Sequence, residues 1–155
     1  MNEDRKYGDI AVALFEKGYN CSQSVFLAFS DMYDMDEETA LKISSSFGGG
    51  MGRLREVCGA VTGMFMVAGM IYGYADPDDR EGKKNHYERI QQLAKEFEKE
   101  NGNLICRNLL GLEEKRQSPV PEPRTKEYYR KRPCSQLVRN AAEIMAQFIA
   151  NQNSI

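Results

Sequence analysis

The sequence has little of several residues on which common functions depend. Its 155 residues include one histidine, no tryptophan and no two cysteines in Cys-x-x-Cys spacing. A Ser-His-Asp triad cannot be argued from the single histidine, His86, which we expect at the surface. The missing Cys-x-x-Cys pair argues against the usual zinc-finger and thioredoxin-type sites. The formal net charge of -2 gives no overall attraction to nucleic acid or to an anionic membrane, so we expect neither as a partner.

Residues that favour β-strands are also scarce. Val, Ile and Thr total 18 of 155 and are scattered, whereas apolar residues recur at helical spacing along most of the chain. The pattern predicts an all-α fold, a compact single-domain bundle that spans residues 1–155. With ends set by capping residues and glycines, about six or seven helices are expected, near residues 4–17, 21–30, 37–47, 57–75, 86–101, 104–110 and 134–150.

The stretch from residue 57 to residue 75 contains no charged side chain. Its length alone would suffice for a membrane span, but four glycines, a threonine and two tyrosines dilute its hydrophobicity. We therefore interpret it as the central helix of the bundle. The glycines stand four apart, as Gly59 and Gly63 and as Gly69 and Gly73, a spacing that lets another backbone approach closely. That neighbour is a helix of the same chain or, in a homodimer, of a second copy.

Charge and proline are unevenly distributed. Residues 1–40 carry nine acidic and three basic side chains, whereas residues 115–139 carry eight basic and two acidic ones. Opposite faces of one fold, or a dimer contact, are the favoured interpretation, and a basic patch for an acidic partner is the alternative. Three prolines at positions 119, 121 and 123 predict an extended surface excursion at about 112–133, with one helical turn near residues 126–130.

Four cysteines are the main candidates for chemistry. Each falls in or beside the first turn of an expected helix, and basic residues flank three of them. Unpaired N–H groups and the partial positive charge of a helix start favour a thiolate, which is the form that binds metals and attacks disulfides. Four helix starts that converge would form a site with four thiolate ligands, whereas four buried cysteines with no role are the alternative. The candidates are Cys21, Cys58, Cys106 and Cys134.

A glycine-rich turn precedes the second of these cysteines. Residues 44–53 read Ser-Ser-Ser-Phe-Gly-Gly-Gly-Met-Gly-Arg, which fits neither a phosphate-binding loop nor a dinucleotide fingerprint. We expect this turn to bring backbone N–H groups close to Cys58, with Gly49, Gly50 and Gly59 as candidate cofactor-binding positions.

These residues carry a family resemblance. Cys58-Gly59-Ala60-Val61-Thr62-Gly63 forms a Cys-Gly-Ala-x-x-Gly motif, with one cysteine upstream and two downstream. Together with the glycine turn, the Leu-Leu-Gly after Cys106 and the apolar-striped helix after Cys134, it resembles the C_GCAxxG_C_C family of redox-active proteins. The resemblance covers nearly the whole chain. It implies a small helical prokaryotic protein that handles electrons or binds an iron–sulfur cluster.

Three hypotheses follow. In the first, the four cysteines bind an iron–sulfur centre, a [2Fe-2S] cluster in particular, for electron transfer. In the second, the same residues form reversible disulfides, with Cys58 or Cys134 as the nucleophile. In the third, they hold structural zinc, or the chain is a non-catalytic helical interaction module.

The expected partner is a redox protein or a small-molecule electron donor or acceptor. Whether the chain is an oxidoreductase or an electron carrier stays open. The first ten residues contain no apolar run, so we expect neither a secretory signal nor a twin-arginine leader. The sequence therefore predicts a cytoplasmic protein.

Overall fold

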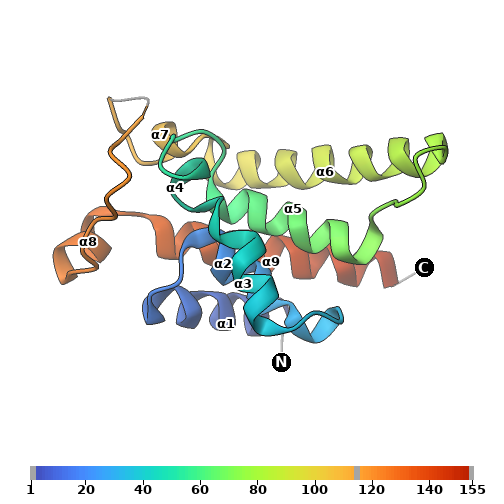
Figure 1. Cartoon of the computed structure of the whole chain (residues 1–155), viewed down its shortest axis with the longest axis horizontal. Helices are drawn as coiled ribbons and strands as arrows, with labels where there is room; N and C mark the ends of the chain where they lie inside the picture. Colours follow the sequence, from blue (N-terminus) through green and yellow to red (C-terminus); the bar gives the residue numbers. More distant parts are fainter. Residues whose placement is uncertain (1–2, 114–115, 154–155) are drawn as a thin grey trace.

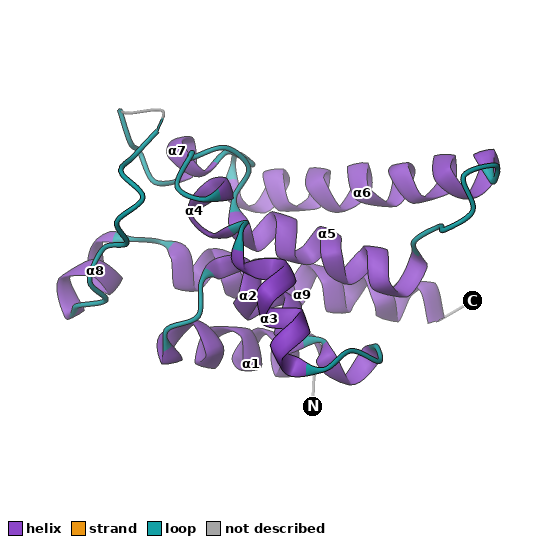
Figure 2. Cartoon of the chain, viewed as in Figure 1, coloured by secondary structure: helices purple, strands orange, loops and turns teal. Residues whose placement is uncertain are grey.

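The chain folds as helices around one central apolar helix, as the sequence predicts. The computed structural model describes residues 3–113 and 116–153. Within these ranges there is no β-strand, only an isolated bridge between Val57 and Ile105 (Figure 2). The helices are α1 (Glu3–Lys17), α2 (Cys21–Ala28), α3 (Glu37–Ser45), α4 (Gly48–Met51), α5 (Gly59–Tyr72), α6 (Arg80–Asn101), α7 (Cys106–Leu109), α8 (Lys126–Lys131) and α9 (Cys134–Asn153), with a 3-10 turn at Ser30–Met32.

Helix α5 lies at the centre and packs against α2, α6 and α9, while α1 packs against α2 and α9 (Figure 1). Eight of its fourteen residues are buried, which explains its lack of a polar face. Of the helices that the structure describes, none is both long enough and apolar enough to cross a bilayer. Figure 1 also shows that α2, α5, α7 and α9 begin near the same end of the molecule.

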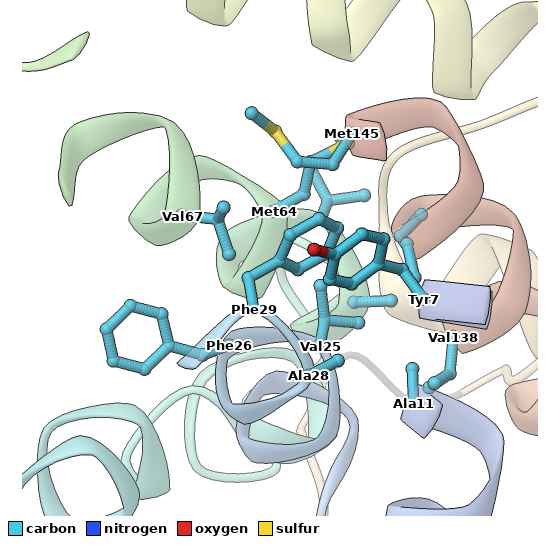
Figure 3. Packing of buried hydrophobic residues seen from close by; sticks show 14 of the residues in the cluster. Tyr7, Ala11, Val25, Phe26, Ala28, Phe29, Met64, Val67, Val138 and Met145 are labelled. Carbon is cyan, nitrogen blue, oxygen red and sulfur yellow. The ribbon is translucent and has the colours of Figure 1, made fainter. Parts of the chain in front are cut away.

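Aromatic and aliphatic side chains from α1, α2, α5 and α9 fill the core (Figure 3). The rings of Tyr7 and Phe29 stack with centroids 4.3 Å apart. Phe29, Met64 and Met145 have no exposed surface. Because each fully buried side chain of this size stabilises the fold by about 1.5–3 kcal/mol, this cluster fixes how α1, α2, α5 and α9 meet.

The glycines of α5 explain how closely α2 approaches it. A Cβ atom at Gly63 would lie 2.8 Å from the carbonyl oxygen of Ser22, and one at Gly59 would lie 3.2 Å from the Cβ of Cys21. The predicted close approach is therefore correct for this pair. It is wrong for the other pair, because a Cβ atom added at Gly69 would meet nothing within 4 Å outside its own helix, and Gly73 is the C-terminal capping residue of α5.

Two further expectations need correction. Helix α6 begins at Arg80, capped by the side chain of Asp79, within a segment expected to be a polar turn. His86 is buried, with 9% of its surface exposed, and its ring lies edge-on to Tyr74. The helix begins earlier than the start near residue 86 that the sequence predicts, and His86 lies on its buried face together with Leu93 and Phe97.

The excursion at about 112–133 is extended except at α8, as predicted, although two of its residues, 114 and 115, lie outside the described residues. It does not simply project into solvent. The guanidinium of Arg124 lies 4.1 Å from the ring centre of Phe15 and donates hydrogen bonds to the carbonyl oxygens of Phe15 and Tyr19. These contacts fold the excursion back over the end where the four cysteine helices begin.

Candidate functional site

All four cysteines lie at helix starts. Cys21, Cys106 and Cys134 are the first residues of α2, α7 and α9, and Cys58 is the N-terminal capping residue of α5. The four side chains line one cavity of about 200 Å³, which we call the cysteine cavity. A single water needs only about 10–15 Å³, so this space can hold a small molecule. The fold thus brings together residues that are separated by 37, 48 and 28 positions along the chain.

Backbone hydrogen bonds fix two of the four. The N–H of Cys58 donates to the carbonyl of Leu104 at 2.8 Å, and the N–H of Cys106 donates to the carbonyl of Glu56 at 2.6 Å. Residues 56–58 and 104–106 therefore run antiparallel to each other around the isolated Val57–Ile105 bridge, and Cys58 and Cys106 lie on opposite sides of that bridge.

Cys21 is fixed by a different device. Asn20 accepts a hydrogen bond from the backbone N–H of Gln23, and the Gln23 side chain accepts one from the N–H of Asn20. This reciprocal capping box sets where α2 begins. The side chain of Asn20 also donates to the carbonyl of Ser45 and so ties the start of α2 to α3.

The backbone from residue 47 to residue 56, in the glycine-rich turn and just after it, is unusual. Its positive φ angles include three at residues other than glycine: 69° at Met51, 67° at Arg53 and 58° at Arg55. Gly50, at φ 68°, leaves no room for a side chain, since a Cβ there would lie 2.6 Å from the Cβ of Cys106. The turn is therefore packed directly on a site cysteine. Gly49, Gly50 and Gly59, the predicted cofactor-binding glycines, all line the cysteine cavity.

Cys21 and Cys134 form a hydrogen-bonded pair. The thiol of Cys21 donates to the sulfur of Cys134, which lowers the pKa of Cys134 to about 7 against the effect of burial. The positive charge of Arg132 and a hydrogen bond from the Tyr128 hydroxyl lower it further. The pKa of Cys21 is raised well above its usual value, first by that hydrogen bond to Cys134 and then by burial. As the pH rises through about 7 the pair therefore loses one proton, and the proton that remains stays on the Cys21 side of the pair.

Cys58 and Cys106 have the opposite character. Burial raises the pKa of Cys58 to about 12, although the backbone N–H groups of Ala60 and Val61 oppose that rise. Burial also raises the pKa of Cys106, and the guanidinium of Arg55, whose Nη1 lies 3.4 Å from the sulfur, opposes it. Both are therefore neutral thiols at pH 7.

Neither a disulfide nor a metal centre is formed by the residues in the described ranges. All four cysteines are free thiols. In the described part of the chain, no three His, Cys, Asp or Glu side chains are arranged to hold a metal ion.

Arginines make up much of the remaining wall. Arg53 is the last residue of the glycine-rich turn, Arg55 follows it, and Arg124 comes from the excursion. Glu122, also on the excursion, is the only acidic residue among the described ones that line the cavity. The excess of basic residues over positions 115–139 signals the part of this wall that Arg124 supplies. The interpretation of that excess as one of two opposite faces of the fold, or as a dimer contact, did not include the return of Glu122, Arg124 and Tyr128 to the cavity that Cys134 lines.

The comparison with protein families agrees with the resemblance noted in the sequence. The family described as "Putative redox-active protein (C_GCAxxG_C_C)" matches residues 19–148, a range that contains all four cysteines and the glycine-rich turn. The chain belongs to this family. No match was found among curated proteins or among solved structures.

Proposed function

We propose that this member of the C_GCAxxG_C_C family is a thiol–disulfide redox protein in which Cys134 attacks and Cys21 resolves. The observation that carries the proposal is that both cysteines line one cavity large enough for a small molecule, where their interaction lowers the pKa of Cys134 and raises that of Cys21. A reactive dithiol needs one sulfur that is a thiolate near neutral pH and a second thiol in contact with it. Cys134 and Cys21 meet both requirements.

The sequence left Cys58 and Cys134 as alternative nucleophiles, and their surroundings favour Cys134. Arg132 and the Tyr128 hydroxyl stabilise negative charge on Cys134, whereas burial keeps the proton on Cys58. The cavity wall next to Cys134 therefore supplies what a thiolate needs, and the wall next to Cys58 does not.

The reaction balances with a disulfide as the electron acceptor. The Cys134 thiolate attacks one substrate sulfur, the substrate S–S bond breaks, and the first half leaves as a thiolate that takes the proton from Cys21. The Cys21 thiolate then attacks the Cys134 sulfur and expels the second half as a thiolate. Two protein thiols lose two electrons to become one disulfide, and the substrate gains both electrons as it splits into two thiols.

A four-cysteine iron–sulfur centre is the second candidate. The observation that favours it is that all four thiols line the same cavity, because four cysteines are the usual donor set for such clusters. Cys21, Cys58, Cys106 and Cys134 would hold the cluster, with Gly49, Gly50 and Gly59 close around it. A bound cluster would supply one-electron transfer. The same four thiols also suit zinc, so metal analysis belongs in the test.

Serine variants of the four cysteines test the proposal. Fully reduced protein is mixed with bis(2-hydroxyethyl) disulfide, and its thiols and peptides are followed by mass spectrometry. Wild type should lose two thiols and yield a Cys21–Cys134 linkage, Cys21→Ser should stop at an adduct on Cys134, and Cys134→Ser should react at least about tenfold more slowly.

The matched controls are Cys58→Ser and Cys106→Ser. Both variants should still form the adduct on Cys134 and should still resolve it into the Cys21–Cys134 disulfide. A wild-type protein that never links Cys21 to Cys134 would refute the dithiol proposal. Iron and acid-labile sulfide in protein purified without oxygen, lost together in each of the four serine variants, would instead support the iron–sulfur candidate.

A further inference from the structure

Three guanidinium groups meet around one carboxylate oxygen beside the cysteine cavity. The Oε1 atom of Glu122 lies 2.6 Å from the Nη2 of Arg132, 3.9 Å from that of Arg53 and 4.0 Å from that of Arg55. These arginine side chains are 15%, 18% and 6% exposed, respectively. We call them the arginine cluster. The point where they meet already accommodates one carboxylate oxygen, which shows that the geometry suits an acidic group.

The arginines carry more charge than Glu122 balances. Arg124 joins Arg53 and Arg55 in the cavity wall, and Arg132 lies behind Glu122 on its ion pair, so that four positive charges surround one carboxylate among the described residues. Positive charge gathered in a concave, partly buried wall attracts anions more strongly than the same charge on an open surface. The overall charge of the chain is slightly negative, so this attraction is local to the site.

Neutral groups hold these guanidiniums in place. The side-chain oxygen of Gln117 accepts hydrogen bonds from Arg53 at 3.3 Å and from Arg55 at 2.9 and 2.7 Å. The carbonyl of Ser118 accepts a further bond from Arg53. These acceptors fix the orientation of the arginines without neutralising them. A site with its donors positioned in advance loses less conformational entropy when an anion binds.

The backbone at the arginine cluster is strained. Both Arg53 and Arg55 adopt left-handed φ angles, which cost a residue other than glycine of order 1–3 kcal/mol where the conformation is sparsely populated. A chain that needed only a tight turn would place glycine at these positions, as it does at Gly49, Gly50 and Gly52. Strain of this kind is concentrated at functional sites.

We propose that the cysteine cavity takes a small-molecule disulfide that carries a carboxylate group, with Arg53, Arg55 and Arg132 binding the carboxylate while Cys134 attacks the disulfide. The inference rests on the proposed thiol–disulfide function and names its substrate class. The substrate carboxylate takes the place of Glu122, whose side chain is 35% exposed and therefore has solvent to move into. Apolar residues of the wall, Phe15, Leu109 and Leu137, contact the short carbon chain between carboxylate and sulfur.

The bonds that form and break, and the electrons that move, are those of thiol–disulfide exchange by Cys134 and Cys21. The Cys134 sulfur bonds to one half of the substrate, which stays in the cavity with its carboxylate on the arginine cluster, and the other half leaves as a thiol. The thiolate of Cys21 then displaces the bound half. The substrate disulfide gains two electrons, and the protein dithiol loses them.

Three disulfides of similar size and different charge test the inference on the full-length protein. They are bis(2-carboxyethyl) disulfide, which is anionic, bis(2-hydroxyethyl) disulfide, which is neutral, and cystamine, which is cationic. Each rate is divided by the rate of the same disulfide with free 2-mercaptoethanol. The normalised rate at Cys134 should be at least about tenfold higher for the anionic disulfide than for the neutral one, and lowest for cystamine.

The key variant is Arg53→Gln, which removes one charge and keeps a residue with a Cβ at the same backbone position. It should reduce several-fold the ratio of the anionic to the neutral rate, with both rates measured on the same variant. The matched control is Arg130→Gln, because the Arg130 side chain is 75% exposed on α8 and the substitution changes the net charge equally. That variant should retain the wild-type preference.

The outcomes separate this inference from the proposed function. Equal normalised rates for the three disulfides, followed by closure of the Cys21–Cys134 linkage, would overturn the inference and leave the proposed function standing. A preferred anionic adduct on Cys134 that Cys21 never resolves would support the arginine cluster and refute the dithiol reaction. No reaction at Cys134 with any of the three would overturn both.

Discussion

The pH dependence of Cys134 is the sharpest consequence of the structure. Its pKa of about 7 depends first on the hydrogen bond from the Cys21 thiol. Replacing Cys21 by alanine removes this donor and leaves Arg132 and Tyr128 in place, so the pKa of Cys134 should rise towards the ordinary cysteine value of about 8.5. The variant Cys58→Ala makes the same chemical change at a residue that does not contribute to this lowering.

The size of the effect can be worked out. With a pKa of about 7, half of Cys134 is thiolate at pH 7, whereas an ordinary cysteine is about 3% thiolate, roughly a fifteenfold difference. A thiolate of lower pKa is intrinsically less nucleophilic, by about fivefold for this shift. The net advantage in attacking a disulfide at pH 7 is therefore about threefold, and above about pH 8 the ordinary thiol becomes the faster one.

The assay is alkylation by iodoacetamide between pH 5 and 10, with the modified Cys134 peptide quantified by mass spectrometry. Wild type and Cys58→Ala should show a midpoint near pH 7 and a plateau above pH 8, because the thiolate forms as the pH rises through the pKa. Cys21→Ala should shift the midpoint upward. A wild-type rate that keeps rising through pH 9, or a midpoint that Cys21→Ala leaves in place, would refute the assignment of Cys134 as the stabilised thiolate.

Three further predictions concern the scaffold and are checked by urea denaturation. Asn20→Ala removes the cap of α2, and Asp36→Ala removes the cap of α3. Each should lower the free energy of unfolding by about 1 kcal/mol. Only Asn20→Ala should also change the rate at which Cys134 attacks a disulfide. Gly50→Ala should destabilise the protein more than Gly111→Ala does, since both glycines have positive φ but only Gly50 is crowded; equal losses would contradict the close contact. Phe29→Ala should cost about 3–5 kcal/mol, and a loss below 1 kcal/mol would show that its ring is not in the core.

Local rules accounted for the helices and for the placement of the cysteines. Asn20 and Asp36 cap helices as their side chains allow, and Gly18 and Gly102 follow helix ends in left-handed conformations. These are interactions between residues a few positions apart, so the sequence reveals them directly. The same rules misjudged α6, because burial of His86 against Tyr74 depends on a tertiary contact that periodicity does not record.

The choice of cysteine partners could not come from local rules. Cys21 and Cys134 are 113 residues apart, with the other two cysteines between them along the chain. All four have similar helix-start surroundings. Only the packing of α2 and α9 around α5 places the Cys21 thiol against the Cys134 sulfur. This neighbour and the Tyr128 hydroxyl distinguish Cys134 from the equally buried Cys58.

By itself, therefore, the sequence determined an all-α fold, four cysteines at helix starts and a glycine-rich turn, because capping, periodicity and backbone conformation act over a few residues. The tertiary structure decided that these cysteines share one cavity and that Cys21 and Cys134 are in contact. It also decided that the excursion folds back to place Glu122 and Arg124 in the cavity wall. These features depend on side chains that are distant in sequence meeting in a packed core, where burial and neighbouring charge set the chemistry of each sulfur.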